Sequence, residues 1–273
     1  GQRTERIGGT KMVTVNDILQ YMNTLAPASM KMDWDNVGLL CGSKAQPVTK
    51  LLVALDPFEN VCHEAKEVGA ELIITHHPLI FQPVKAVTDD TEVGRCIQYL
   101  CRHGISAINA HTNLDCAPDG VNDRLAGLLG LQNVEVIDPM GTDEQGRPWG
   151  LLRCGEVPEQ TLENFLSTVK ERLSCEGLRY VGNRTVRKVA VGGGACGSEL
   201  MDAIRSGCDT FVTADLKYNQ FHDAHSLGIN LIDAGHFHTE NPIVAVLAEK
   251  LTAAFPNIQV VVSKTHTESM KYY

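Results

Sequence analysis

Short apolar runs rich in leucine, valine and isoleucine recur along the chain, and amphipathic segments separate them. Runs of this length predict buried β-strands, whereas apolar residues spaced three and four apart predict helices. Residues 50–56 and 72–74 are two such runs, and residues 59–68 between them predict a helix. A strand, a helix and a second strand in this order are typical of a parallel, right-handed βαβ unit. The sequence therefore predicts an α/β fold.

Several of these apolar runs are followed immediately by residues that can bind a metal. They form four stretches with seven of the ten histidines: His76-His77, then His111 with Asp115, then His236, His238 and Glu240, and more weakly Asp215 with His222 and His225. Pro78 ends any strand ladder, so His76 and His77 stand at the carboxyl end of a strand. Because open α/β sheets place their chemistry outside the carboxyl ends of the strands, we expect these stretches to converge.

A weak repeat divides the chain into two halves. Three segments of the first half match three of the second at one constant offset: 50–53 with 188–191, 65–69 with 203–207, and 73–77 with 211–215. A fourth match, of 104–110 with 228–234, follows at a slightly shorter offset. Two strands and a helix in register predict two related α/β lobes, an internal duplication, with a metal site between them.

The predicted domain boundaries follow from this repeat. Residues 1–11 contain neither methionine nor an apolar pattern, so we interpret them as a remnant of cloning. We expect a first lobe over residues 12–140 and a second lobe over 141–273 that closes the site, with a C-terminal strand that can return to the first lobe. Residues 141–147 are the most loop-like stretch, and they form either a hairpin or the lobe boundary.

Composition narrows the class of protein. The chain has 273 residues, 43% of them hydrophobic, which is enough for one large core or two smaller ones. A net charge of -9 makes nucleic acid an unfavourable principal partner, because phosphate binding needs clustered Lys and Arg. The nine cysteines are odd in number and form no C-x-x-C pair, which indicates reduced thiols and a cytoplasmic location. No apolar run reaches the roughly 20 residues of a membrane span.

The donor atoms favour transition metals. Histidine nitrogens together with carboxylate oxygens suit Zn, Fe, Mn, Co or Ni, whereas Ca and Mg favour oxygen alone and structural zinc favours thiolates. The candidate ligands are His76, His77, Asp115, His236 and Glu240. This set is too large for one tetrahedral ion, but it fits two ions about 3.5–4 Å apart.

Other residues near these stretches have alternative interpretations. His238 ranks below His236 as a ligand, and His222 is either a proton shuttle or a surface residue. Residues 192–194 are three glycines after a strand, but they lack the full spacing of a phosphate-binding loop, so a tight turn is the preferred interpretation.

The combination of motifs resembles the Nif-three-like family, also known as GTP cyclohydrolase 1 type 2 homologues. The motifs are Trp34-Asp35-Asn36-Val37-Gly38-Leu39, Thr75-His76-His77-Pro78, His111-Thr112-Asn113-Leu114-Asp115, and Gly235-His236 with Thr239-Glu240. The likeness extends from about Met12 to the last strand near Val262. It implies two α/β lobes, a dinuclear metal site and a toroidal homohexamer whose sites face an internal cavity. It also implies that the five candidate ligands bind the metals, with Glu240 as the bridge.

Two functions are consistent with this resemblance. In the first, two divalent Zn, Fe or Mn ions lower the pKa of water toward about 7 for hydrolysis of a nucleotide-like or other small substrate. His222 or His111 then transfers the proton. In the second, the protein is a metal-binding scaffold or metal carrier that acts through protein interactions. Ligands rich in carboxylate that leave open coordination positions favour chemistry over storage.

Overall fold

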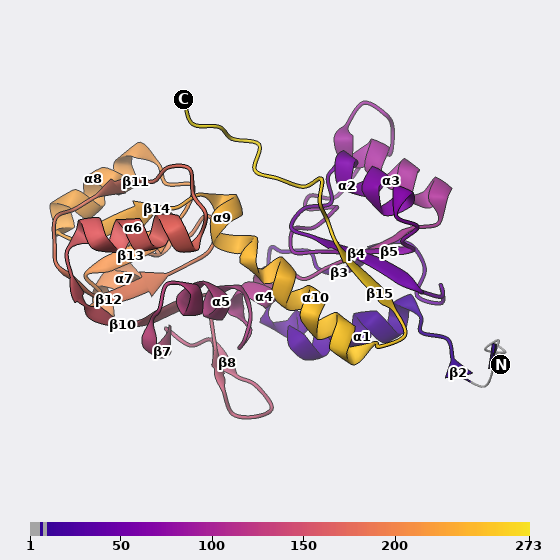
Figure 1. Ribbon diagram of the computed structural model, residues 1–273, viewed down its shortest axis with the longest axis horizontal. Helices are drawn as coiled ribbons and strands as arrows, with labels where there is room; N and C mark the ends of the chain where they lie inside the picture. Colours follow the sequence, from indigo (N-terminus) through magenta and orange to yellow (C-terminus); the bar gives the residue numbers. More distant parts are fainter. Residues whose placement is uncertain (1–5, 8–9) are drawn as a thin grey trace. The chain divides into compact units, whose positions relative to one another are not determined.

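The computed structural model describes residues 6–7 and 10–273, which form two compact units (Figure 1). Unit 1 comprises Gly1–Leu114 and Val244–Thr267, and unit 2 comprises Asp115–Ile243 and Glu268–Tyr273. The chain therefore divides after Leu114, earlier than the boundary at residue 140 that we inferred from the sequence. Of the predicted cloning remnant, residues 1–5 and 8–9 lie outside the described residues. The short strands β1 (Arg6–Ile7) and β2 (Thr10–Lys11) pair antiparallel.

The sheet of unit 1 has the strand order β15-β4-β5-β6-β3. Its strands are β3 (Gly38–Cys41), β4 (Lys50–Ala54), β5 (Leu72–Thr75), β6 (Ser106–Asn109) and β15 (Gln259–Val262). The first four strands in this order are parallel, and β3 joins β6 antiparallel at the edge. The predicted βαβ unit is confirmed. Strands β4 and β5 pair in parallel, and α2 (Glu59–Glu67) connects them in the sequence.

Helices cover both faces of the unit 1 sheet. Helices α2 and α3 (Glu92–His103) lie on one face, and α1 (Val15–Leu25) with α10 (Pro242–Ala254) on the other (Figure 1). A short 3-10 helix, η1 (Ala28–Met30), follows α1. Strands covered on both faces can be apolar throughout, which is why the run Leu72, Ile73, Ile74 is fully buried.

The sheet of unit 2 has the strand order β11-β14-β13-β12-β10-β7. Its strands are β7 (Gln132–Ile137), β10 (Leu152–Gln160), β11 (Arg179–Val181), β12 (Val186–Val191), β13 (Thr210–Thr213) and β14 (Asn230–Asp233). Strands β12, β13 and β14 are parallel, and the others are antiparallel to their neighbours. The mixed α/β fold predicted from the sequence is thus confirmed.

A hydrophobic core lies on each face of this second sheet. Leu125 of α5 (Val121–Leu128) and Phe165 of α6 (Leu162–Arg172) belong to one core. Ala203 of α7 (Leu200–Arg205) and Ala224 of α8 (Tyr218–Leu227) belong to the other. The remaining short helices are α4 (Thr112–Cys116), η2 (Gly197–Glu199) and α9 (His236–Glu240).

The sequence signals at turns and helix ends are partly confirmed. Residues 141–147 form a hairpin, in which β8 (Gly141–Thr142) pairs with β9 (Pro148–Trp149). Thr14 caps α1 through a capping box with Asp17, as expected for a threonine before a helix. The sequence predicts a helix over residues 121–129 with Asp119 as its N-cap, but the N-cap of α5 is Gly120. Among the helices that the structure describes, none combines the length and apolar character that crossing a bilayer requires.

Candidate metal centre

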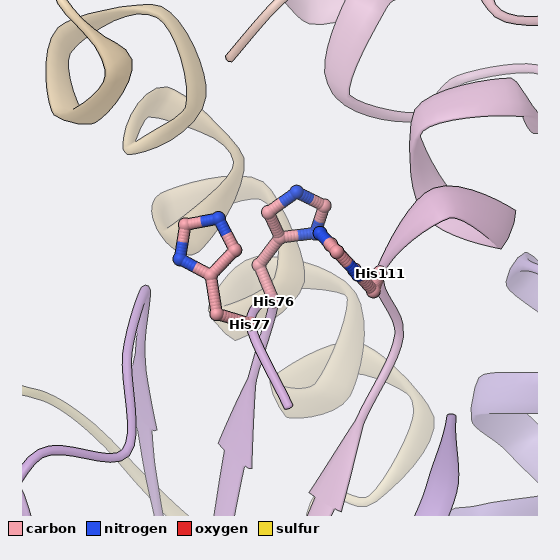
Figure 2. Close-up of side chains that lie close together, drawn as sticks. All are labelled: His76, His77 and His111. Carbon is pink, nitrogen blue, oxygen red and sulfur yellow. The ribbon is translucent and has the colours of Figure 1, made fainter. Parts of the chain in front are cut away.

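Three histidines of unit 1 lie together at the carboxyl edge of its sheet (Figure 2). His76 and His77 directly follow β5, and His111 comes two residues after β6, the neighbouring parallel strand. One ring nitrogen from each imidazole lies within 4.8 Å of the other two. The ring centroids are 5.0 Å apart for His76 and His77, 5.2 Å for His76 and His111, and 5.4 Å for His77 and His111. We call these residues the histidine triad.

Hydrogen bonds fix the orientation of all three imidazoles through Nδ1. The partners are the carbonyl oxygen of Ala110 for His76 at 2.8 Å, Asp56 for His77 at 2.7 Å, and Asp35 for His111 at 2.8 Å. A carbonyl or carboxylate oxygen only accepts, so each Nδ1 carries the proton and donates it. The neutral imidazole then has its lone pair on Nε2, and this is the tautomer that binds metals in proteins.

Asp35 is a buried carboxylate that holds His111. It also accepts hydrogen bonds from the backbone N–H of Thr112 at 3.0 Å and from the Thr112 hydroxyl at 2.5 Å. Burial raises the pKa of Asp35, but the hydrogen bonds from His111 and Thr112 outweigh it and lower the pKa to about 2. Asp35 is therefore ionised at neutral pH. The motif that contains Asp35 is visible in the sequence, but its hydrogen bond to His111 is not.

Asp56 connects His77 to a residue that sequence analysis missed. Its second carboxylate oxygen lies 2.9 Å from Nε2 of His266, which follows strand β15. Burial raises the pKa of Asp56, while hydrogen bonds from His266 and His77 bring it below its usual range. Asp56 comes shortly after the carboxyl end of β4, so the rule that singled out His76 and His77 also applies to it.

Unit 2 contains a second group of candidate ligands, on α9 and nearby. His236 and Glu240 are one helical turn apart, and Nε2 of His236 lies 3.0 Å from the Glu240 carboxylate. Nδ1 of His236 lies 2.7 Å from Asp215. Asp115, in α4, has a carboxylate oxygen within 4.8 Å of one of Glu240. Asn241-Pro242 is typical of a helix start and predicts Glu240 in the turn between a strand and that helix, but Glu240 ends the short helix α9, which only Asn241 separates from α10.

Negative charge is concentrated around this second group. Burial lowers the pKa of His236, but the carboxylates of Glu240 and Asp215 outweigh it and raise the pKa to about 10. Burial likewise raises the pKa of the Cys196 thiol well above its ordinary value, and the charges of Asp115 and Glu240 raise it further. An environment that stabilises positive charge and opposes a thiolate suits a metal cation.

The triple glycine at residues 192–194 packs against these ligands. Gly194 has φ +71, and a side chain there would place its Cβ 2.3 Å from Oε1 of Glu240. The backbone N–H groups of Gly193 and Gly194 donate to the side chains of Asn122 at 2.7 Å and Thr239 at 2.9 Å. Because side chains of the protein already occupy these donors, the geometry fits a tight turn rather than a phosphate-binding loop.

The remaining histidines of the four stretches are not members of these groups. His222 and His225 are exposed on α8. His238 directs Nδ1 to the carbonyl oxygen of Leu173 at 3.2 Å. Among the described residues, the groups of potential metal ligands include none of these three histidines.

Comparisons with known proteins give a consistent result. The model of the Duf34/NIF3 (NGG1p interacting factor 3) family matches residues 13–269. A Clostridium perfringens protein named GTP cyclohydrolase 1 type 2 homolog is 35% identical over 262 residues, which cover 94% of this chain and 99% of that protein. A crystal structure of a Staphylococcus aureus hypothetical protein matches with a TM-score of 0.90 at 31% identity, covering 96% of this chain and 100% of the other. A Bacillus cereus protein related to NIF3 matches with a TM-score of 0.89 at 28% identity, covering 97% and 100%.

Proposed function

Because the chain belongs to the Duf34/NIF3 family, as its motifs indicated, we propose that it is a metal-dependent hydrolase with two divalent transition-metal ions per chain. The residues that would hold the ions are His76, His77, Asp115, His236 and Glu240. The proposed substrate is nucleotide-like or another small molecule, in keeping with the cyclohydrolase names of the relatives. Zn, Fe and Mn are the candidate metals, because each accepts mixed nitrogen and oxygen ligands.

The observation that carries this proposal is the hydrogen bonding of the imidazoles. Every histidine of the proposed set is bonded through Nδ1, to a carbonyl oxygen for His76 and to a carboxylate for His77 and His236. Such bonds direct Nε2 toward a metal and raise the basicity of the ring. Three imidazoles in unit 1 and an imidazole with two buried carboxylates in unit 2 offer donors for two ions. We propose one dinuclear site, because the repeat in the sequence and the resemblance both predict ligands from the two halves of the chain.

The other side chains have roles in positioning and proton transfer. Divalent ions held by such a set supply Lewis-acid chemistry and make water a stronger nucleophile near neutral pH. His111 is the proposed proton-transfer group, because Asp35 fixes its ring beside His76 and His77. His222 is the second candidate for this role. Asp115 and Glu240 offset the positive charge of the ions with their buried carboxylates.

Three further features complete the proposal. We propose that the two units arose by internal duplication, since β4-β5-β6 and β12-β13-β14 are both runs of adjacent parallel strands.

We also propose a cytoplasmic homohexamer. Its support is the resemblance, together with nine cysteines that form no C-x-x-C pair in the sequence, a pattern that suits a reducing compartment. Sedimentation equilibrium tests the assembly, and a monomer at all concentrations would contradict it.

A first experiment counts metals. The purified chain, stripped with chelator and reloaded with Zn, Fe or Mn in turn, should contain about two ions by elemental analysis. Glu240→Gln removes a carboxylate charge and should lower the count toward one, whereas His222→Asn should leave both ions bound. A wild-type count of one or zero with every metal would overturn the dinuclear site.

A second experiment distinguishes a hydrolase function from a scaffold or carrier function. The loaded protein is screened against GTP, other nucleotides, phosphoesters and cyclic amides, with ring opening and phosphate release as readouts. Any activity should collapse in Glu240→Gln, while His222→Asn and His111→Asn should slow proton transfer. Activity that survives Glu240→Gln belongs to another site or a contaminant. Full metal occupancy without activity on any compound would favour the scaffold or carrier function.

A further inference from the structure

Two cysteines of unit 1 place their sulfur atoms 3.7 Å apart. Cys41 is the last residue of β3, and Cys101 lies in the last turn of α3. Cys101 is exposed and Cys41 is half-buried, so solvent reaches this pair. Two other pairs of thiols interact, and all four of their members are buried: Cys62 with Cys96, and Cys154 with Cys208.

An irregularity in strand β3 brings Cys41 to this position. Leu39 lies opposite Ile108 of β6, but Cys41 lies opposite Ala107, so β3 contains one extra residue between the two pairs. Side chains alternate between faces along β6, and residues opposite each other on antiparallel strands share a face. The bulge therefore turns Cys41 away from the face of Leu39 and onto that of Ala107.

Helix α3 covers the face to which Cys41 turns. Ala107 packs in one core with Cys96 and Leu100 of α3, and Cys41 packs against the same core. Cys101 directly follows Leu100 in the helix. A regular β3 would have pointed Cys41 to the opposite face of the sheet. The contact between the two thiols thus depends on the bulge.

We propose that Cys41 and Cys101 form a site of reversible oxidation, at which a low-molecular-weight disulfide converts the two thiols into an intramolecular disulfide. The thiolate of Cys101 attacks one sulfur of the reagent, the sulfur–sulfur bond of the reagent breaks, and one reagent thiolate leaves. Cys41 gives its proton to that thiolate and attacks the Cys101 sulfur, which displaces the second reagent thiol. Two protein thiols are oxidised, and one reagent disulfide is reduced to two thiols.

Exposure and charge set the order of these two steps. Burial and the neighbouring Cys101 raise the pKa of Cys41 to about 12, so Cys41 remains protonated until the reagent is attached. Cys101 is the exposed member and reacts first. The two sulfurs are 3.7 Å apart, and a disulfide bond of about 2.05 Å requires only a small further approach.

The cross-link would fasten the edge strand β3 to helix α3. It closes a loop from residue 41 to residue 101, and a loop of that length restricts the unfolded chain strongly. Oxidation should therefore raise the melting temperature by several degrees. This expectation is independent of the proposed metal site.

The test uses the full chain, reduced and then exposed to glutathione disulfide under native conditions. After remaining thiols are blocked by alkylation, peptide mass spectrometry should find Cys41 joined to Cys101, with the other seven cysteines alkylated only after unfolding. Dithiothreitol should reverse the bond and the rise in melting temperature.

Two variants identify the order of attack. Cys41→Ser should retain glutathione on Cys101, because no second thiol displaces it, whereas Cys101→Ser should leave Cys41 reduced. The proposal is overturned if wild-type Cys101 keeps its glutathione, if it pairs with another cysteine or a second copy, or if neither thiol reacts. Equal reaction of Cys154 and Cys208 would also contradict it, since burial should protect that pair.

Discussion

At the scale of single residues, carboxylates that accept hydrogen bonds from the histidines hold the imidazole rings in place. Asp56 bonds His77 at 2.7 Å and His266 at 2.9 Å. Asp56→Asn keeps the size of the side chain but removes its charge and one acceptor, so metal affinity should fall about 10–100-fold. Competition with a chromophoric chelator measures this change. Asp89→Asn, an exposed change in the same unit, is the control, and equal affinity in both variants would contradict the assigned role.

Gly194 offers a second prediction, because its missing side chain makes room for Glu240. Gly194→Ala places a Cβ 2.3 Å from Glu240 Oε1 at φ +71, whereas Gly207→Ala has φ +78 and meets only the Lys188 amine at 4.0 Å. Both changes should destabilise the fold by about 1–2 kcal/mol through backbone strain. Only Gly194→Ala should also lose metal, as isothermal titration with Zn would show. Equal loss in both variants would mean that strain alone is responsible.

The positions of the histidines can be predicted from the sequence, but the side chains that hold them cannot. His76 and His77 stand where predicted because apolar runs and Pro78 mark the end of β5 unambiguously. The role of Asp35 and the presence of His266 were missed because their partners come from distant parts of the chain, and pairing of this kind has no local pattern. The assignment of Glu240 to a turn failed because α9 is only one turn long and ends one residue before the helix that begins at Pro242.

At the scale of elements, one buried carboxylate fastens the segment after β15 to helix α2. Glu64 accepts from the Ser263 hydroxyl at 2.5 Å, the Lys264 backbone N–H at 2.7 Å and the Thr265 hydroxyl at 2.8 Å. Burial raises the pKa of Glu64, but these hydrogen bonds lower it overall. Its carboxyl is thus more acidic in the folded protein than in the unfolded chain.

The sign of the pH effect follows from this difference. Glu64 stabilises the fold above its unfolded pKa of about 4.3, and the contribution is lost as the pH falls through the lower folded pKa. The substitution Glu64→Gln should therefore lower the free energy of unfolding by about 1–3 kcal/mol near pH 7 and by less at acid pH. Urea unfolding at several pH values measures the difference from wild type. Glu67→Gln, exposed on the same helix, should show neither effect, and a loss for Glu64→Gln that does not shrink in acid would contradict the argument.

Elements were predicted best where they are buried. Apolar spacing and Pro242 predict helices over residues 59–68, 93–103 and 243–254, and α2, α3 and α10 begin within one residue of these positions. Strand β7 was missed, since its pattern of mostly exposed residues gives no apolar run. The sequence pattern also predicts one strand over residues 149–156, but the structure divides this stretch between β9 and β10, with a short irregular segment between them.

At the scale of the whole molecule, unit 1 depends on a strand from the far end of the sequence. Strand β15 pairs in parallel with β4 and covers its edge. A chain that ends before Gln259 should expose that edge, so hydrogen exchange of the β4 amides should accelerate and aggregation should increase. A chain that ends after Thr267 keeps β15 and is the control. Unchanged β4 protection in the shorter chain would show that the edge needs no partner.

The return of the chain to unit 1 also has a consequence for biosynthesis. Translation makes β4 first and β15 only after the whole stretch Asp115–Ile243 has been added. At usual elongation rates, the edge of β4 waits roughly 10–40 s for its partner. During that interval the nascent chain presents an open strand to the ribosome surface and to neighbouring chains, which is the kind of surface that chaperones shield. The sheet of unit 1 can therefore be complete only after residues 259–262 have been synthesised.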